Sequence, residues 1–329
     1  MIITKQSSNF NLYHALDIIF FADYNSIMMK CNICPRNCNI DRSIHKGYCK
    51  SEENIHVSKV MLHKWEEPCI SGPCECINDN IGSGTIFFSG CNLRCIYCQN
   101  YDISQLKSGK KISIETLVSI FKQLENKGAY NINLVTPTHY TEQIIKALKI
   151  YKPSIPVIWN SSGYEKVETL KKLEGLIDIY LMDFKYFDET IAKELSLAPN
   201  YPSNAKSCLL ECKRQIPNNI FDKNGLMKKG IIVRHLCLPT YTDDSKNIVN
   251  WINENLGNKT ILSIMSQYVP MHKALSHPKI NRKLKPIEYK IVVSHLQKLG
   301  FSNAYIQDFD SQSTDFTPNF QEDCDDYDY

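Results

Sequence analysis

Short apolar runs alternate with helical segments from residue 85 to about residue 300, and this alternation constrains the fold more than any other feature. The runs, rich in β-branched and aromatic residues, predict strands at 85–89, 131–135, 157–160, 177–183, 230–236 and 260–265. In the first connection, Ser113 suits a helix N-cap, an apolar stripe begins at Leu117, and Gly128 suits the helix end. Further helices are expected around 142–151, 164–173, 189–195, 245–255 and 287–299. Such units indicate parallel strands joined by right-handed crossovers, in an open doubly wound sheet or a barrel. In both folds, functional loops follow the C-terminal ends of the strands.

The charge and the apolar stretches exclude some classes of protein. The 329 residues carry 38 basic and 35 acidic side chains, a formal net charge of +3, and this near balance argues against nucleic-acid binding. The apolar stretch 18–22 is too short to span a bilayer, and no basic segment leads into it. We therefore expect a cytoplasmic protein without a membrane partner. In that compartment clustered cysteines bind metal or do redox chemistry more often than they form disulfides.

Three of the fourteen cysteines follow the first predicted strand at the spacing C-x3-C-x2-C, as Cys91, Cys95 and Cys98. Three thiolates from one short loop can hold three irons of a 4Fe-4S cluster and leave the fourth iron open for a substrate. The next cysteine along the chain is Cys208, far downstream. Zinc knuckles prefer four ligands in pairs, so zinc and inert buried thiols fit this loop less well.

The loop resembles the signature of the radical S-adenosylmethionine (SAM) superfamily, in which an aromatic residue, here Tyr97, precedes the last cysteine. The stretches 82–91, 131–140 (NINLVTPTHY), 178–185 (DIYLMDFK) and 265–270 (MSQYVP) narrow the resemblance to the PflX-type branch, which is similar to pyruvate formate-lyase activating enzymes. The resemblance covers roughly residues 30–300. It implies an α/β fold, a partial (β/α)6 barrel with a small Cys-rich N-terminal module.

The resemblance also implies chemistry: an oxidoreductase-type enzyme whose reduced cluster cleaves SAM to a 5′-deoxyadenosyl radical that abstracts hydrogen. Its catalytic ligands would be Cys91, Cys95 and Cys98, and its electron donor a flavodoxin or ferredoxin. One substrate class would be a glycyl-radical enzyme, activated at a backbone glycine. A peptide, a cofactor precursor or an RNA base are alternatives, as is a non-catalytic metal-binding scaffold.

Residues at the strand ends would contact SAM according to the same resemblance. Most relatives carry a glycine-rich stretch after the second strand, where this chain has Thr136-Pro-Thr138-His139. Tyr97 would lie by the adenine, or pack the loop, and His139 is as often structural. Asp183 and Lys185 should share one face of their strand by alternation. Arg234 would neutralise the SAM carboxylate or, alternatively, form a salt bridge in the barrel wall. The full set of predicted SAM contacts is Tyr97, Thr136, Thr138, His139, Asn160, Ser161, Asp183, Lys185 and Arg234.

A second group of cysteines lies upstream, in a stretch with little hydrophobic periodicity. Cys31, Cys34, Cys38 and Cys49 are enough for a closed zinc site or an auxiliary iron–sulfur cluster, and free thiols are the alternative. Cys69, Cys74 and Cys76 occupy a separate turn-rich loop, as ligands or reduced thiols. We divide the chain into an N-terminal extension (1–30), a Cys-rich module (31–80), a radical SAM core (81–305) and an acidic, disordered tail (306–329).

Overall fold

The computed structural model describes residues 30–72, 81–106 and 108–312, together with Pro318, Phe320 and Tyr327. The strands are β1 (Ile55–His63), β2 (Ser83–Phe88), β3 (Lys110–Ile112), β4 (Ile132–Val135), β5 (Val157–Ser161), β6 (Ile179–Asp183), β7 (Ile220–Phe221), β8 (Met227–Leu236), β9 (Ile261–Met265) and β10 (Ala304–Ile306). The α-helices are α2 (Pro68–Ser71), α3 (Ile114–Asn126), α4 (Thr141–Ile150), α5 (Val167–Lys171), α6 (Glu189–Ser196), α7 (Tyr201–Gln215), α8 (Thr242–Asn255) and α9 (Pro286–Lys298).

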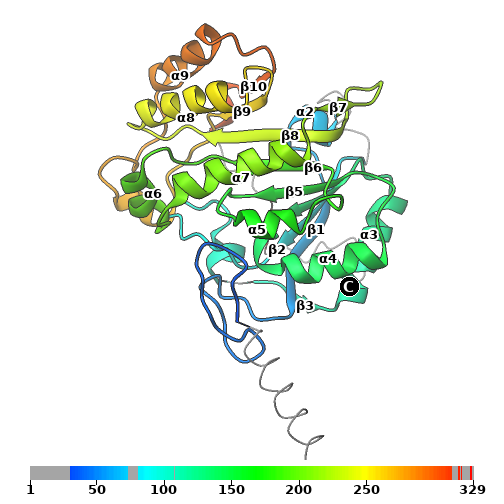
Figure 1. Cartoon of the computed structure of the whole chain (residues 1–329). Helices are drawn as coiled ribbons and strands as arrows, with labels where there is room; N and C mark the ends of the chain where they lie inside the picture. Colours follow the sequence, from blue (N-terminus) through cyan, green and yellow to red (C-terminus); the bar gives the residue numbers. More distant parts are fainter. Residues whose placement is uncertain are drawn as a thin grey trace, which may run out of the picture.

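One sheet runs in the order β10-β9-β8-β6-β5-β4-β2-β1-β3. From β2 to β10 every neighbouring pair is parallel, and the strands follow one another in chain order. Because each right-handed crossover steps in the same direction, the long helices fall on one face of the sheet. Figure 1 shows α4, α5 and α7 in front of the strands. The order excludes the doubly wound alternative, and the predicted partial barrel is confirmed.

Both faces of the parallel strands are buried, as is usual for such sheets. Strand residues such as Leu134 and Trp159 pack outward against the helices in the main core. Their neighbours Ile158 and Leu181 point to the inner face, where Ile70 of α2 packs against them. The short segment that contains α2 therefore lies against the inside of the barrel and brings its polar neighbours there.

Strand β1 was not expected from the sequence. It pairs antiparallel with β2 from Val57 opposite Phe88 to His63 opposite Ser83, and Val57 and Val60 are fully buried. A bulge between Val57 and Lys59 shifts the alternation by one residue, which hides the strand from a period-two pattern. Residues 31–80 thus contribute a strand to the main sheet. The division of the chain at residues 80 and 81 stays a prediction.

Helix α7 was also missed, and its cysteines explain why. Cys208 and Cys212 are one helical turn apart and fully buried, so they take core positions that aliphatic residues usually mark. By contrast, α3 is confirmed with its cap, because the Ser113 hydroxyl accepts a hydrogen bond from the Thr116 amide at 3.1 Å.

The ends of the chain are only partly covered. The predicted N-terminal extension and most of the acidic tail lie outside the described residues. Two tail residues contact the body: the Phe320 ring meets Phe87 edge-on at 5.4 Å between centroids, and Tyr327 is buried beneath the Lys127 amine. Among the described residues, no helix combines the length and apolar character needed to cross a membrane.

Candidate functional site

The loop of Gly90 to Cys98 leaves the C-terminal end of β2 and lies against the N-terminal residues. Gly90 has φ of +90°, and a Cβ there would come within 2.6 Å of the Cys49 carbonyl oxygen and 2.5 Å of the Ser51 hydroxyl. Glycine is needed for both the backbone angle and the close approach. The Arg36 side chain also donates to the Asn92 carbonyl at 2.7 Å, so the two Cys-containing regions form one contact surface.

Each sulfur of this loop has a polar neighbour that holds it in place. The Leu93 amide donates to Cys91 Sγ at 3.4 Å, and the Ser196 hydroxyl donates to Cys95 Sγ at 2.9 Å. Cys98 Sγ lies 3.2 Å from the Ser104 hydroxyl. Such second contacts orient metal ligands and tune the redox potential of a bound cluster.

The three thiols lie close enough to influence one another. Burial raises the pKa of Cys91 to about 12, and Cys95 and Cys98 add to this rise. Burial also raises the pKa of Cys98 to about 11, with Cys95 as the second cause. Three adjacent thiolates in this half-buried loop repel one another, and cluster iron would supply the positive charge that stabilises them. The donor set fits a cluster.

No group of three His, Cys, Asp or Glu side chains in the described parts of the chain is arranged to hold a single metal ion.

Two residues at the ends of β4 and β5 face the barrel mouth. Thr136 has φ of +58°, a strained left-handed conformation for a β-branched residue, and its amide donates to the Asn160 carbonyl at 2.9 Å. Strain of this kind persists where the surrounding structure fixes it, and such positions cluster at functional sites. Asn160 lies on the inner face, in register with Ile158.

Asp183 and Lys185 form an ion pair of 2.6 Å at the end of β6, as their shared face predicted. Burial works against a charged amine, but Asp183 and then Cys95 outweigh it and raise the pKa of Lys185 well above its usual value. Lys185 in turn lowers the pKa of Cys98. A permanent positive charge therefore stands beside the cysteine loop.

Four predicted SAM contacts have side chains that support the walls. The Tyr97 hydroxyl bonds the Tyr186 hydroxyl at 2.5 Å, and His139 Nε2 lies 2.7 Å from the Ser89 carbonyl oxygen. The two others bind neighbouring groups: Thr138 donates to Glu165 at 2.6 Å, and Ser161 accepts from the Gly163 amide at 3.2 Å. For Tyr97 and His139 this is the packing alternative that the sequence left open.

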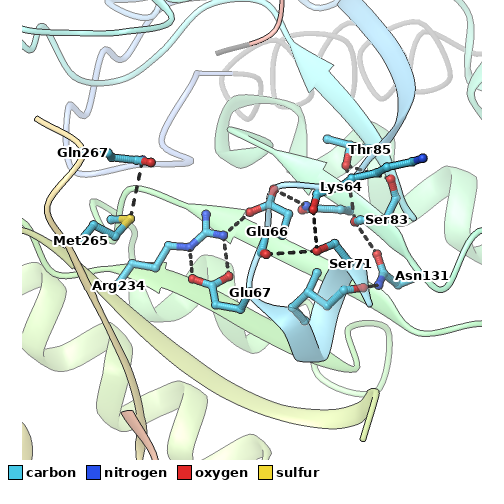
Figure 2. A network of polar contacts seen from close by, with 12 residues as sticks. Lys64, Glu66, Glu67, Ser71, Ser83, Thr85, Asn131, Arg234, Met265 and Gln267 are labelled. Atoms are coloured by element: carbon cyan, nitrogen blue, oxygen red, sulfur yellow. Dashed lines mark hydrogen bonds and ion pairs between the residues drawn. The ribbon is translucent and has the colours of Figure 1, made fainter. Parts of the chain in front are cut away.

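Of the two predicted roles of Arg234, the structure shows the salt bridge in the barrel wall. Its Nε and Nη2 donate to both oxygens of Glu67 at 2.7 and 2.6 Å, and Nη2 also donates to Glu66 (Figure 2). The third nitrogen, Nη1, takes no part in these bonds. Arg234 stands opposite Asp183 in the β6–β8 register. The carboxylate role predicted for Arg234 would therefore have to use Nη1.

Residues 85–252, just over half of the chain, match the family model of the radical SAM superfamily. An uncharacterized protein of Methanocaldococcus jannaschii is 32% identical over 291 residues, which cover 85% of this chain and 78% of that protein. The chain belongs to the radical SAM superfamily.

Further relatives are more distant from this radical SAM protein. The pyruvate formate-lyase-activating enzyme of Clostridium pasteurianum is 22% identical over 214 residues, 62% of this chain and 82% of that enzyme. Among solved structures, anSMEcpe with bound AdoMet aligns with a TM-score of 0.47 at 16% identity, over 68% of this chain and 62% of that one. Streptococcus suis SuiB bound to precursor peptide SuiA aligns with a TM-score of 0.44 at 14% identity, over 66% of this chain and 46% of SuiB. The chain thus spans about half the length of SuiB.

Membership implies a 4Fe-4S cluster and SAM as cofactors of this radical SAM protein. The resemblance drawn from the sequence is confirmed at the level of the superfamily and of distant homology to the activating enzymes. The individual ligands and SAM contacts stay predictions.

The upstream cysteines of the radical SAM chain gather in one place. Cys38 and Cys49 have their sulfurs 3.7 and 3.4 Å from the position of a Cβ on Gly47. Burial raises the pKa of Cys34 to about 12, and Cys49 and Cys31 contribute to the rise. Cys69 is separate from them, buried in α2 on the inner face. Cys74 and Cys76 lie outside the described residues.

Sequence reasoning missed the residues that face Arg234 from inside the barrel. Glu66 and Glu67 directly precede Pro68, and they are joined inside the barrel by His63 and Asn133. The only signal was an acidic pair before a proline. Nothing local indicates that this pair meets an arginine 167 positions later in the chain.

Proposed function

We propose that this protein cleaves SAM reductively at a 4Fe-4S cluster held by Cys91, Cys95 and Cys98. The observation that carries the proposal is the set of three half-buried, neighbouring thiols, each with its own polar support, at the C-terminal end of the first barrel strand. When bound, the cluster and SAM supply one-electron chemistry that yields methionine and a hydrogen-abstracting 5′-deoxyadenosyl radical.

The chain's own residues would bind and orient SAM. Lys185, kept charged by Asp183, offers a fixed positive charge to the SAM carboxylate as a charge-assisted donor. Asn160 offers an amide, and Thr136, in a left-handed backbone conformation, stands where relatives carry a glycine-rich stretch. Tyr97 would contribute through its backbone, since its hydroxyl is bound elsewhere. Arg234 could add Nη1.

The buried aromatic residues behind the loop would keep the site dry and rigid. Tyr97, Tyr186 and Ser196 form a hydrogen-bonded chain that ends on Cys95. All three are buried, so water cannot replace these contacts readily. Exclusion of water protects a reactive radical from side reactions.

The finer assignment is activation of a glycyl-radical enzyme. Similarity to pyruvate formate-lyase activating enzymes over more than half of the chain supports it, with a flavodoxin or ferredoxin as electron donor. The fold and the cluster do not by themselves determine the substrate.

We also propose a second metal centre on Cys31, Cys34, Cys38 and Cys49. Gly47 leaves room beside two of the sulfurs. Burial raises the pKa of Cys31 and Cys34, and the neighbouring cysteines add to both rises. Four thiolates can hold either a zinc ion or an iron–sulfur cluster. Two cubanes would give about eight irons per chain, and one cubane with zinc about four.

Anaerobic reconstitution tests the main proposal. Protein loaded with iron and sulfide, reduced with dithionite and given SAM should form 5′-deoxyadenosine and methionine in equal amounts. A chain that binds an oxygen-sensitive cluster but forms no 5′-deoxyadenosine would be the scaffold alternative.

A second measurement tests the finer assignment. With pyruvate formate-lyase present, a glycyl radical should appear by electron paramagnetic resonance. Formation of 5′-deoxyadenosine without that signal would reject this partner and favour a peptide, cofactor precursor or RNA substrate.

A further inference from the structure

The inner face of the barrel carries a polar cluster made of Glu66, Glu67, Arg234, Asn133 and His63, of which the proposed SAM chemistry uses only Arg234. Glu66 and Glu67 have side chains only 8% and 5% exposed. Segment 64–71 is fixed there by further polar contacts, including the Asn131 amide to the Ile70 carbonyl at 2.7 Å and Ser71 to the Glu66 carbonyl at 3.0 Å (Figure 2). These carboxylates are therefore held in position before any ligand arrives.

The charges within this cluster do not balance. Arg234 meets Glu67 through two parallel hydrogen bonds, a fork that matches one carboxylate. Glu66 receives one guanidinium nitrogen and the Asn133 amide at 2.9 Å. Although burial favours its neutral form, Arg234 lowers the pKa of Glu66, so it stays ionised. Two carboxylates thus share one guanidinium.

Two buried polar atoms beside Glu66 have no hydrogen-bond partner within the part of the chain that the structure describes: Asn133 Oδ1 and His63 Nδ1. Asn133 is fully buried and His63 is 7% exposed. Because the Asn133 nitrogen is committed to Glu66, the atom left over is an acceptor. Burial lowers the pKa of His63, so its ring is neutral and one ring nitrogen can accept. Buried polar atoms in a native fold usually have a partner, so these two acceptors are available to a bound group.

What the cluster offers is therefore negative charge and acceptors. An alkylammonium group has three donors, one positive charge and no acceptor, and so it fits this set. We propose that Glu66, Asn133 and His63 bind an alkylammonium group of the substrate. The inference rests on the proposed function, because it treats the inner face as the substrate side of the SAM site. Arg234 lies opposite Asp183 in the sheet, so the bound amine would be one strand away from the pair proposed to hold SAM.

The same chemistry could come from a lysine side chain of a peptide or from a small free amine. Three probes distinguish them: the tripeptide Gly-Lys-Gly with blocked ends, its norleucine counterpart, and cadaverine. Binding is measured by calorimetry on the reconstituted full chain with SAM but without reductant, so that no turnover is needed. The lysine peptide should bind about tenfold or more tighter than the norleucine peptide. Binding of cadaverine alone would identify a small amine as the source.

Two variants test whether the preference for the lysine peptide depends on this cluster. Glu66→Gln should lose the preference for lysine over norleucine, and His63→Phe, which keeps a ring but removes the acceptor, should reduce it. Glu142→Gln, on α4 at a surface ion pair with Lys172, is the matched control and should behave like wild type. Equal binding of the lysine and norleucine peptides, with cadaverine not bound, would overturn the proposal, as would an unchanged preference in both variants. Because binding is read without SAM cleavage, failure of the SAM chemistry would be seen separately, in the 5′-deoxyadenosine assay.

Discussion

The two groups of cysteines lie in segments that pack against each other, but their sulfurs are bonded by different parts of the chain. Cys91, Cys95 and Cys98 receive their hydrogen bonds from Leu93 of their own loop and from two serines, of which Ser196 lies at the end of α6 in the barrel. In the upstream group, Cys38 accepts a hydrogen bond from the Tyr48 amide at 3.3 Å, a contact within the Cys-rich N-terminal segment. The first set has three thiols and the second has four. A set of three anchored by the barrel leaves an iron free for a ligand, whereas a set of four can close its centre.

The contact between these groups is tight at Gly90, beside the Cys49 carbonyl. A metal centre in the upstream group would therefore lie near the radical SAM cluster, because the backbone at Gly90 packs directly against the backbone at Cys49. The difference predicts that the downstream cysteines carry the reaction and the upstream ones support it, and substitutions can separate these roles.

The largest effect is expected for Cys95→Ala. Removing one of only three ligands exposes a second iron, so SAM cleavage should fall by about a thousandfold or more. The 5′-deoxyadenosine assay measures this. Cys212→Ala, which removes a fully buried thiol on α7, should keep most of the activity. Equal rates for the Cys95 variant and wild type would show that the loop is not the cluster site.

Lys185→Met should raise the KM for SAM by about tenfold to a hundredfold, because it removes a buried positive charge and keeps the side-chain volume. The cluster should still assemble, since Lys185 is not a ligand. Initial rates of 5′-deoxyadenosine formation at several SAM concentrations, together with iron content, distinguish these effects. Loss of iron with an unchanged KM would place Lys185 outside the SAM site.

How far the sequence leads differs between the two regions as well. The strand after which the cysteine loop begins, the cap at Ser113 and the shared face of Asp183 and Lys185 all follow from local periodicity, and the structure bears them out. Strand β1 escaped because its bulge breaks the alternation, and α7 because cysteines occupy its core positions. Local sequence patterns thus predicted the features that depend on neighbouring residues in the chain.

The inner face of the barrel could not be predicted in the same way. Arg234 meets Glu66 and Glu67 only because α2 folds against the inner ends of the strands, a contact between segments far apart in the chain. Ser161 lies next to Asn160 but on the other face of the strand, where it accepts a hydrogen bond from Gly163. Register within the sheet, not residue type, decides which polar groups face a ligand.

Cys49→Ser tests the upstream centre and should have a smaller effect on turnover than the loss of Cys95. If the second centre is a cubane, iron and sulfide should fall by about half. SAM cleavage should persist to within about tenfold, because all three downstream ligands remain. Iron, zinc and sulfide analysis on the same preparation reads the result. Unchanged metal content would show that these cysteines are free thiols.

Ser196→Ala should have the smallest effect on SAM cleavage, and it should change the reduction potential of the cluster without changing its assembly. The Ser196 hydroxyl donates to Cys95 Sγ and so draws electron density from the thiolate, which favours the reduced cluster. Without this donor the reduction potential should become more negative by tens of millivolts, and cleavage with a weak reductant should slow a few-fold while iron content stays constant. Redox titration followed by electron paramagnetic resonance measures the shift. Ser203→Ala, an exposed serine on neighbouring α7, is the control and should leave the potential unchanged. A potential that moves equally in both variants would mean that Ser196 only packs beside the loop, and the barrel would then lose its proposed part in tuning the cluster.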